Sequence, residues 1–434
     1  MRHNMLSERD GFLNSLPAGW KFDRLKDVAT LRNDKTDIAS EEEDYLELED
    51  MESGTGRILS RQNTLEVESA VILFKKGDVL FGKLRPYLEK YYQAEFDGKC
   101  TGEILAFKPE RINSRFLFYC VASPLFIERC NVLAYGAKMP RVNWPTQLSQ
   151  FYLPLPPLPV QVRIETYLDA SCAAIDNALM AKRSELATLE ALKRSVIESA
   201  VTKGIRPHPT LRRVAEDWIS AIPSHWDCCR IKRVVSGVDY GISESTEEQG
   251  RFRVLKMGDI NDGEIDASDL DFIDDVSDDL LLEKGDLLYN RTNSPDQVAK
   301  AAIFRGSKED RITFASYLVR LRTNHRADPY FLNYLLNSEG FLSFARKLAI
   351  PSVQQSNLNS TRYCRIFIPV PPRPEQVEIA AFLHQKTTET MRIITQIEQQ
   401  IETLVAYRKS LINECVTGQR RVTEAALTKV QIYG

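Results

Sequence analysis

The chain repeats part of its own sequence, and this repeat constrains the architecture more than local patterns do. The stretch from Pro156, PPLPVQVRIETYLD, aligns without a gap with the stretch from Pro371, PPRPEQVEIAAFLH, at an offset of 215 residues. About 40 residues further on the offset still holds, because Val201-Thr202 matches Val416-Thr417. The sequence therefore predicts two copies of one structural unit with a pseudo-twofold relationship.

A second similarity opens each half of the chain. Leu16-Pro17-Ala18-Gly19-Trp20 resembles Ile222-Pro223-Ser224-His225-Trp226 at an offset of 206 residues. About 135 to 145 residues of little similarity follow each opening, apart from KKGDVLF at Lys75 and EKGDLLY at Glu283. The predicted order is a variable domain, a shared segment, a second variable domain and a second shared segment.

The variable segments have the pattern of mixed α/β domains. Strand-like runs such as Val79–Phe81, Ile104–Phe107 and Tyr317–Leu321 are bounded by Gly, Pro and Asp. Helical stretches follow them, for example Arg115–Cys120 and Tyr330–Leu336. We expect an α/β (α+β) fold in each copy, without a predicted strand count.

The shared segments have the pattern of long helices. Pro159 and Pro374 stand where a helix begins, and Gly204 and Gly418 stand where the two helices end. Between them, apolar residues recur at steps of three and four: Ile175, Leu179, Leu186, Leu189, Leu192 and Val196, then Ile394, Ile397, Ile401, Leu404 and Leu411. A helix of about 40 residues is roughly 60 Å long and needs a partner for its apolar stripe. We expect the other copy to be that partner. The alternative is two separate helices, each packed on its own domain.

Composition and charge leave the ligand open. The 434 residues are 43% hydrophobic and 27% charged, which is typical of a folded chain with two or three domains. The net charge of -3 differs from that of an autonomous nucleic-acid binder, which is usually basic. Three explanations remain: no nucleic-acid binding, positive charge gathered on one surface, or partner subunits that supply part of the contacts.

The cysteines and the apolar runs bear on metal binding and location. The eight cysteines form no CxxC pair, and the five histidines have no ligand spacing to them, so we expect reduced thiols and no zinc site. Met1–Asp10 is polar, and the longest apolar stretch, Phe116–Ile127, is short and contains Pro124. We therefore expect a cytoplasmic protein without a signal peptide or a membrane span.

Two near matches to catalytic motifs fail. Gly77–Leu84 fits the GxxxxGK pattern, but Leu84 stands where a phosphate loop needs Ser or Thr for magnesium. Asp328-Pro329-Tyr330-Phe331 approaches the adenine-methyltransferase tetrad but lacks its second proline. We expect a chain with no catalytic centre, metal or cofactor of its own.

Several phrases occur in a characteristic order. They are LPLPPLPVQ (153–161) and IPVPPRPEQ (368–376), IPSHW (222–226), GDVLFGKLRPYLEK (77–90), GDLLYNRTNSP (285–295), and the helix ends LKRSVIESAVTKG and YRKSLINECVTG. Their order and duplication resemble the specificity subunits of type I restriction–modification enzymes, over almost the whole chain.

The sequence also departs from the usual pattern of that family. Val160 replaces a Glu in the first lead-in, and Arg373 replaces a Leu in the second. The first helix keeps Asp169 and Ile175-Asp176, whereas the second has His384, Thr390 and Met391. These changes make the two helices unequal.

The resemblance implies a function and a set of partners. Each variable domain would read one half of a split, asymmetric site in double-stranded DNA, and the two helices would pair antiparallel as a coiled coil that fixes the spacer. Two methyltransferase subunits would dock on the chain, and restriction–translocase subunits can join. S-adenosylmethionine, ATP and magnesium would belong to those partners. Two alternatives remain: a coiled-coil adaptor that binds only proteins, and an enzyme with an unrecognised motif.

The repeat also predicts domain boundaries. They are 1–155 for the first target-recognition domain, 156–208 for the first helix, 209–370 for the second target-recognition domain, 371–418 for the second helix and 419–434 for a C-terminal tail.

Two loops in each variable domain supply the candidate DNA contacts, because Arg, Lys, Asn and Gln read base edges and bind phosphates. In the first domain they are Lys83, Arg85 and Tyr87, with Lys138, Arg141 and Asn143. In the second they are Arg291, Thr292, Asn293, Ser294 and Lys300, with Ser352, Gln354, Gln355 and Asn357. The alternative for each is a solvated or turn-forming role.

The candidate helix-pairing and subunit-interface residues come from the shared segments. They are Gln161, Ile164, Leu168, Ile175, Leu179, Leu186 and Leu189 in the first copy, and Gln376, Ile379, Leu383, Ile394, Ile397, Ile401 and Leu404 in the second. The acidic runs Glu41–Asp44 and Asp266–Asp279 are expected to be solvated and to lie away from DNA.

Overall fold

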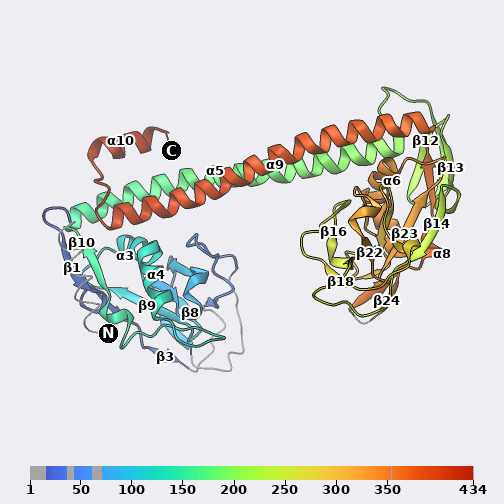
Figure 1. Ribbon diagram of the computed structural model, residues 1–434. Helices are drawn as coiled ribbons and strands as arrows, with labels where there is room; N and C mark the ends of the chain where they lie inside the picture. The colour runs from blue at the N-terminus through green and yellow to red at the C-terminus, as the bar shows by residue number, and fades with distance from the viewer. Residues whose placement is uncertain (1–15, 37–43, 61–70, 353, 434) are drawn as a thin grey trace. The chain divides into compact units, whose positions relative to one another are not determined.

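The computed structural model describes residues 16–36, 44–60, 71–352 and 354–433, so the expectation for Glu41–Glu43 lies outside the described residues. The chain forms two compact units (Figure 1). Unit 1 comprises Met1–Arg183 with Glu398–Gly434, and unit 2 comprises Ser184–Ile397. Each unit thus contains one α/β domain and a part of both long helices, α5 (Leu158–Lys203) and α9 (Arg373–Val416).

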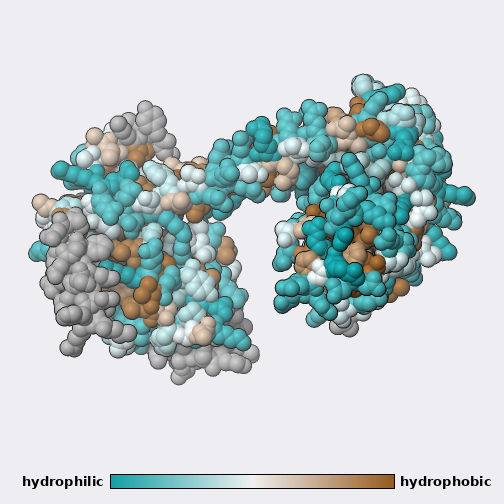
Figure 2. Space-filling view, viewed as in Figure 1, coloured by the Kyte–Doolittle hydropathy of each residue, from teal (hydrophilic) through white to brown (hydrophobic). Residues whose placement is uncertain are grey.

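The long helices pair antiparallel, which confirms the predicted fold class. In unit 1 the beginning of α5, with Ile164 and Leu168, shares a hydrophobic core with Leu411 near the end of α9. In unit 2 the end of α5, with Val201, shares a core with Ile379 near the start of α9. The surfaces of both helices that Figure 2 shows are mostly hydrophilic, as expected of helices with one apolar stripe.

Most of the predicted pairing residues face the interior. Ile164, Leu168, Ile175, Leu179, Ile379, Leu383, Ile394 and Ile397 are buried, and Leu186, Leu189, Ile401 and Leu404 are partly buried. Leu192 was expected in the same stripe but is 54% exposed. The stripe instead passes from Leu189 through the partly buried Lys193 to Val196, because a helix turns 100° per residue and Leu192 falls outside that face.

The duplicated opening motifs cover the ends of the helices. Gly204 follows α5 with φ of +80°, and a Cβ there would lie 3.1 Å from the Trp226 ring. Gly418 follows α9 with φ of +79°, and a Cβ there would lie 2.6 Å from Pro17. The two glycines therefore end their helices in the left-handed conformation, as predicted, and both allow the close approach of a motif that opens a domain.

The domain of unit 1 is built on a four-stranded antiparallel sheet in the order β2-β9-β6-β7. Its elements are β1 (Lys21–Arg24), α2 (Leu25–Val28), β2 (Ala29–Leu31), β3 (Lys35–Thr36), β4 (Tyr45–Leu46), β5 (Val71–Phe74), β6 (Val79–Gly82), η1 (Pro86–Leu88), β7 (Tyr91–Gln93), β8 (Gly98–Cys100), β9 (Ile104–Pro109), α3 (Ser114–Ala122), α4 (Pro124–Leu133), η2 (Leu148–Gln150) and β10 (Tyr152–Leu155), with α10 (Glu424–Tyr433) at the end of the chain. A second sheet has the order β3-β5-β8-β4.

The domain of unit 2 has a corresponding sheet in the order β14-β23-β19-β21, also antiparallel. Its elements are β11 (Leu211–Glu216), β12 (Ile219–Pro223), β13 (Asp227–Arg230), η3 (Ile231–Arg233), β14 (Val235–Tyr240), β15 (Phe252–Leu255), η4 (Met257–Asp259), β16 (Ile260–Asn261), β17 (Glu264–Ile265), β18 (Asp271–Ile273), η5 (Asp278–Leu280), β19 (Leu287–Asn290), β20 (Thr292–Asn293), β21 (Ala301–Ile303), η6 (Lys308–Asp310), β22 (Ile312–Phe314), β23 (Leu318–Thr323), α6 (Pro329–Leu336), α7 (Glu339–Lys347), β24 (Ile350–Ser352), β25 (Gln355–Asn357), α8 (Ser360–Tyr363) and β26 (Phe367–Val370).

Each central sheet is covered by a hydrophobic core on both faces. Because side chains alternate along a strand, neighbouring residues enter different cores. In β6, Val79 and Phe81 pack with α3 and α4, whereas Leu80 packs with the second sheet. In β19, Leu287 and Leu288 divide between two cores in the same way. Within the described ranges, no single helix is both long and apolar enough to span a membrane, although the pair α3 and α4, bent by 59°, together has that length and composition.

A repeated glutamine, one in each copy, connects each domain to the long helix that follows it. Gln161 in α5 accepts a hydrogen bond from the backbone N–H of Asn113 and donates to the carbonyl of Pro156, both at 2.8 Å. Gln376 in α9 accepts from the N–H of Asp328 at 2.7 Å and donates to Pro371 at 2.8 Å. The structure thus gives these glutamines a role between helix and domain rather than in the helix–helix stripe.

Replacing Gln161 or Gln376 with Ala should destabilise its own unit by about 2–4 kcal/mol, because a buried N–H and a buried carbonyl are each left without a partner. Urea denaturation with probes in each unit measures the change in stability. Gln400→Ala, at an exposed position of α9, serves as the control and should change stability little.

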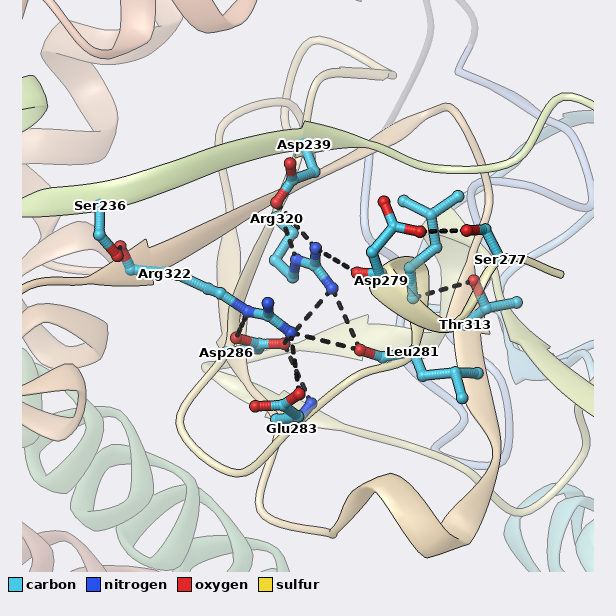
Figure 3. A network of polar contacts seen from close by, with 11 residues as sticks. Ser236, Asp239, Ser277, Asp279, Leu281, Glu283, Asp286, Thr313, Arg320 and Arg322 are labelled. Atoms are coloured by element: carbon cyan, nitrogen blue, oxygen red, sulfur yellow. Dashed lines mark hydrogen bonds and ion pairs between the residues drawn. The ribbon is translucent and has the colours of Figure 1, made fainter.

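Unit 2 also contains a buried arginine in its central sheet, Arg320 (Figure 3). Arg320 in β23 is 2% exposed and donates to Asp239 at 2.8 Å, and to the carbonyls of Asp279 at 2.7 Å and Leu281 at 3.1 Å. In unit 1 the position paired with β6 in the same register is Ala106. The network joins η5 to the central sheet.

Arg320→Met should destabilise unit 2 by about 2–4 kcal/mol, because it leaves the carbonyl of Asp279 and the carboxylate of Asp239 without their arginine donor. Arg322→Met should have a smaller effect, since its side chain is 32% exposed. Equal destabilisation by the two variants in thermal or urea unfolding would contradict this assignment.

Candidate nucleic-acid interface

The two predicted loops of unit 2 meet in a small three-stranded sheet. Strand β20 pairs antiparallel with β25, and β25 pairs antiparallel with β24. The N–H of Leu358 donates to the carbonyl of Arg291 at 2.7 Å. The side-chain amide of Asn357 donates to the hydroxyl of Thr292 at 2.6 Å. We call β20, β24 and β25 the unit 2 ribbon.

Unit 1 repeats this arrangement in shorter form. Arg141 forms isolated antiparallel bridges with both Leu84 and Tyr135. The N–H of Val142 donates to the carbonyl of Lys83 at 3.1 Å, which matches the bond between Leu358 and Arg291. We call Lys83–Arg85, Tyr135 and Pro140–Val142 the unit 1 ribbon. In both units the structure therefore brings together loops that the sequence places more than 50 residues apart.

The side chains at the tip of the unit 2 ribbon are exposed, whereas those at its base hold the strands together. Ser352, Gln354 and Gln355 are exposed, and Gln354 has a left-handed φ of +61°. Thr292 is buried, and its hydroxyl is bonded to Asn357, so both residues hold the strands together. Asn293 and Ser294 form the following turn: the Asn293 side chain accepts from Ser294 N–H at 2.8 Å, and the Ser294 hydroxyl donates to Asp296 at 2.6 Å.

Arg291 lies between two aromatic residues that the sequence did not indicate. Its guanidinium is 5.2 Å from the ring centroid of Tyr240, and the backbone N–H of Arg291 donates to the backbone carbonyl of Tyr317 at 3.0 Å. Both tyrosines are exposed, at 43% and 49%. The Arg291 Nε is buried and makes no hydrogen bond within the chain, whereas Nη1 donates to the carbonyl of Ser316 at 3.4 Å. Lys300, also predicted, is partly exposed.

The unit 1 ribbon has a more basic surface. Lys138 and Tyr87 are exposed, and Lys83 and Arg85 are partly exposed. Arg85 has a left-handed φ of +50°, which sets it at a sharp bend, and its buried Nε makes no hydrogen bond within the chain. Strain of this kind at an exposed loop is typical of binding sites.

Two other predicted residues of unit 1 have partners within the domain. Arg141 forms an ion pair with Glu103 at 3.1 Å. Asn143 accepts from the N–H of Thr146 at 3.0 Å and so forms a turn. Asn359 occupies the matching place in unit 2 and accepts from the N–H of Arg362 at 2.9 Å. The Asn143 side-chain oxygen thus forms a turn, whereas its contact with DNA stays a prediction.

Sequence reasoning missed several exposed residues in or beside the ribbons. They are Tyr135, Met139, Tyr240, Tyr317 and Ile350. Glu103 and Tyr317 hold matching places, because each precedes a central strand and its carbonyl accepts from the backbone N–H of Lys83 and of Arg291 respectively. The sequence carries no repeated motif that marks them. Basic, amide and aromatic side chains on and beside each ribbon are the chemistry that binds phosphates and bases.

Acidic residues in and just before the run Asp266–Asp279 form ion pairs within unit 2. Asp271 in β18 pairs with Lys256, and that ammonium holds the pKa of the Asp271 carboxyl below its usual value. Glu264 pairs with Arg305 at 2.6 Å. Among the residues that the structure describes, no group of three or more His, Cys, Asp or Glu side chains is placed to hold a metal ion.

Comparison with known proteins gives the family. The model of the type I restriction modification DNA specificity domain matches residues 17–186 and 225–403. A putative type I restriction enzyme MjaX specificity subunit of Methanocaldococcus jannaschii is 26% identical over 204 residues, 46% of this chain and 47% of that protein. The EcoDI specificity subunit of Escherichia coli is 28% identical over 46% of this chain and 45% of its own length. The matches thus span about half the length of these relatives.

Solved structures show the same fold. A chain from a study of complex assembly and conformational transition of the type I R-M system has a TM-score of 0.76, at 19% identity, over 94% of this chain and 100% of that one. The HsdS subunit from Thermoanaerobacter tengcongensis has a TM-score of 0.53 at 19% identity, over 93% and 98%. With two matched segments that cover most of the sequence, the chain belongs to the family of type I restriction modification DNA specificity domains.

Proposed function

We propose that the chain is the DNA-specificity subunit of a type I restriction–modification complex and recognises a bipartite, asymmetric site, one half-site per unit. The observation that supports this most directly is the recurrence of one ribbon framework with different exposed side chains. Lys83 and Arg291 occupy the same backbone position, but the tip carries Lys138 in unit 1 and Gln354 with Gln355 in unit 2. Equal frameworks with unequal surfaces suit two different half-sites.

The long helices suit the task of fixing a spacer. Half-site spacing in DNA mirrors the geometry of a protein with internal symmetry. A paired helix holds a separation better than a flexible linker does. Two modest readers on one chain also gain affinity through effective concentration.

Methylation and cleavage belong to partners in this proposal. Two methyltransferase subunits would dock on the chain, and restriction–translocase subunits would join them. S-adenosylmethionine, ATP and magnesium would then bind to those subunits, and this chain would contribute recognition alone.

Genome-wide mapping of methyladenine tests the function directly. Cells that express the chain with a methyltransferase subunit of the same restriction–modification system should methylate a split motif with a constant spacer, and cells without the chain should not. Methylation that does not depend on the chain would favour a protein-only adaptor.

Arg141→Met with Arg291→Met should weaken binding of the methyltransferase complex to its site. The slope of log K against log salt should fall by about 1 for each phosphate that the variant no longer neutralises. Fluorescence anisotropy over a salt series measures both quantities. Lys76→Met with Lys284→Met is the matched control, because these exposed lysines precede β6 and β19, at the opposite end of each strand from its ribbon. An unchanged slope in the arginine variant would refute the interface.

A further inference from the structure

One buried ion pair in unit 1 joins both long helices to the domain. Arg408 of α9 is 8% exposed, and its Nε donates to Asp176 of α5 at 3.1 Å. Its terminal nitrogens donate to the carbonyls of Gly54 at 3.2 Å and Thr55 at 3.4 Å. Three segments that are distant in the sequence therefore meet at one guanidinium.

Neighbouring contacts hold the same loop of the domain. Arg57 pairs with the other carboxylate oxygen of Asp176 at 3.0 Å. The hydroxyl of Tyr91 donates to the carbonyl of Gly54 at 2.7 Å. The planar fork of Arg408 serves a carboxylate and two carbonyls at once, which a lysine ammonium does less well.

The repeat lacks this contact in unit 2. At the offset of 215 residues, Arg408 corresponds to Lys193 and Asp176 to Met391. The Lys193 ammonium lies 3.4 Å from the Met391 sulfur, and Met391 is 43% exposed. A second acid on the same face, Asp169, binds Arg115 and Tyr119 in unit 1, and His384 stands in its place on α9.

From this inequality we propose that Asp176 and Arg408 are positioning residues that fix the first recognition domain on the helix pair and so restrict the spacer between half-sites. Burying two charges costs desolvation, so a pair of this kind contributes to a defined orientation more than to stability. The consequence for the spacer rests on the proposed function, whereas the orienting contact does not.

Arg408→Met tests the proposal in the full chain assembled with its methyltransferase subunits. Affinity is measured for duplexes with the cognate spacer and with spacers one base pair longer or shorter. We expect discrimination between spacers to fall about tenfold in the variant, within the range of coupling between contacting residues. Arg408→Lys, which keeps the charge, should discriminate between spacers less well than the unaltered chain and better than Arg408→Met. Lys193→Met, the matched change in unit 2, should discriminate like the unaltered chain.

Hydrogen exchange of the same variants, without DNA, provides an independent measurement. Residues 54–57 should exchange faster in Arg408→Met and not in Lys193→Met. If Arg408→Met does not fold, Arg57→Met, which removes one partner of Asp176 from a half-exposed position, must show a smaller change in the same direction.

Spacer discrimination and hydrogen exchange together distinguish the positioning role of the ion pair from the proposed function of the chain. Unchanged exchange and unchanged spacer discrimination, or equal effects of Lys193→Met, would overturn the positioning role. An unaltered complex that binds no split site would overturn the proposed function, and the exchange experiment would still decide whether the ion pair orients the domain.

Discussion

Burial of one apolar stripe against another along α5 and α9 is the interaction on which the rest of the structure depends. Neither helix could remain isolated at this length, because its stripe would face water. Each domain in turn is attached to both helices, through a repeated glutamine at a helix start and a tryptophan or proline at a helix end. The helix pair is therefore part of both units rather than a linker between finished domains.

The two domains show how one framework can present different surfaces. The Asp that follows the repeated Gly is retained, as Asp78 and Asp286, and each accepts from a backbone N–H three residues earlier. Their arginine partners differ: Asp78 pairs with Arg32, at 2.7 Å, and Asp286 pairs with Arg322, at 2.9 Å. The backbone turn is thus preserved while the side chains around it change.

The distribution of charged side chains allows a protein with a net negative charge to present a basic surface. Carboxylates of unit 2 pair among β17, β18 and their neighbours, and those of α5 face Arg115 and Arg408. Lys83 and Lys138, in contrast, lie on the unit 1 ribbon or at its tip, where side chains are exposed or partly exposed. Net charge alone therefore says little about what this protein binds, since charge is distributed by the fold.

The duplication, the α/β character of the variable segments, the two long helices and the glycines at which they end could all be predicted from the amino-acid sequence. Each of these features depends on a repeat, a periodicity or a local conformational preference, which can be recognised without knowledge of tertiary contacts. The three-dimensional fold was needed to show that Thr292 and Asn143 build strands and turns, that Leu192 faces solvent, and that Tyr240 and Tyr317 lie beside Arg291. The strand and turn assignments depend on which distant strands pair and in which register, because a one-residue change of register would move every side chain to the opposite face. The exposure of Leu192 depends on which face of α5 is buried.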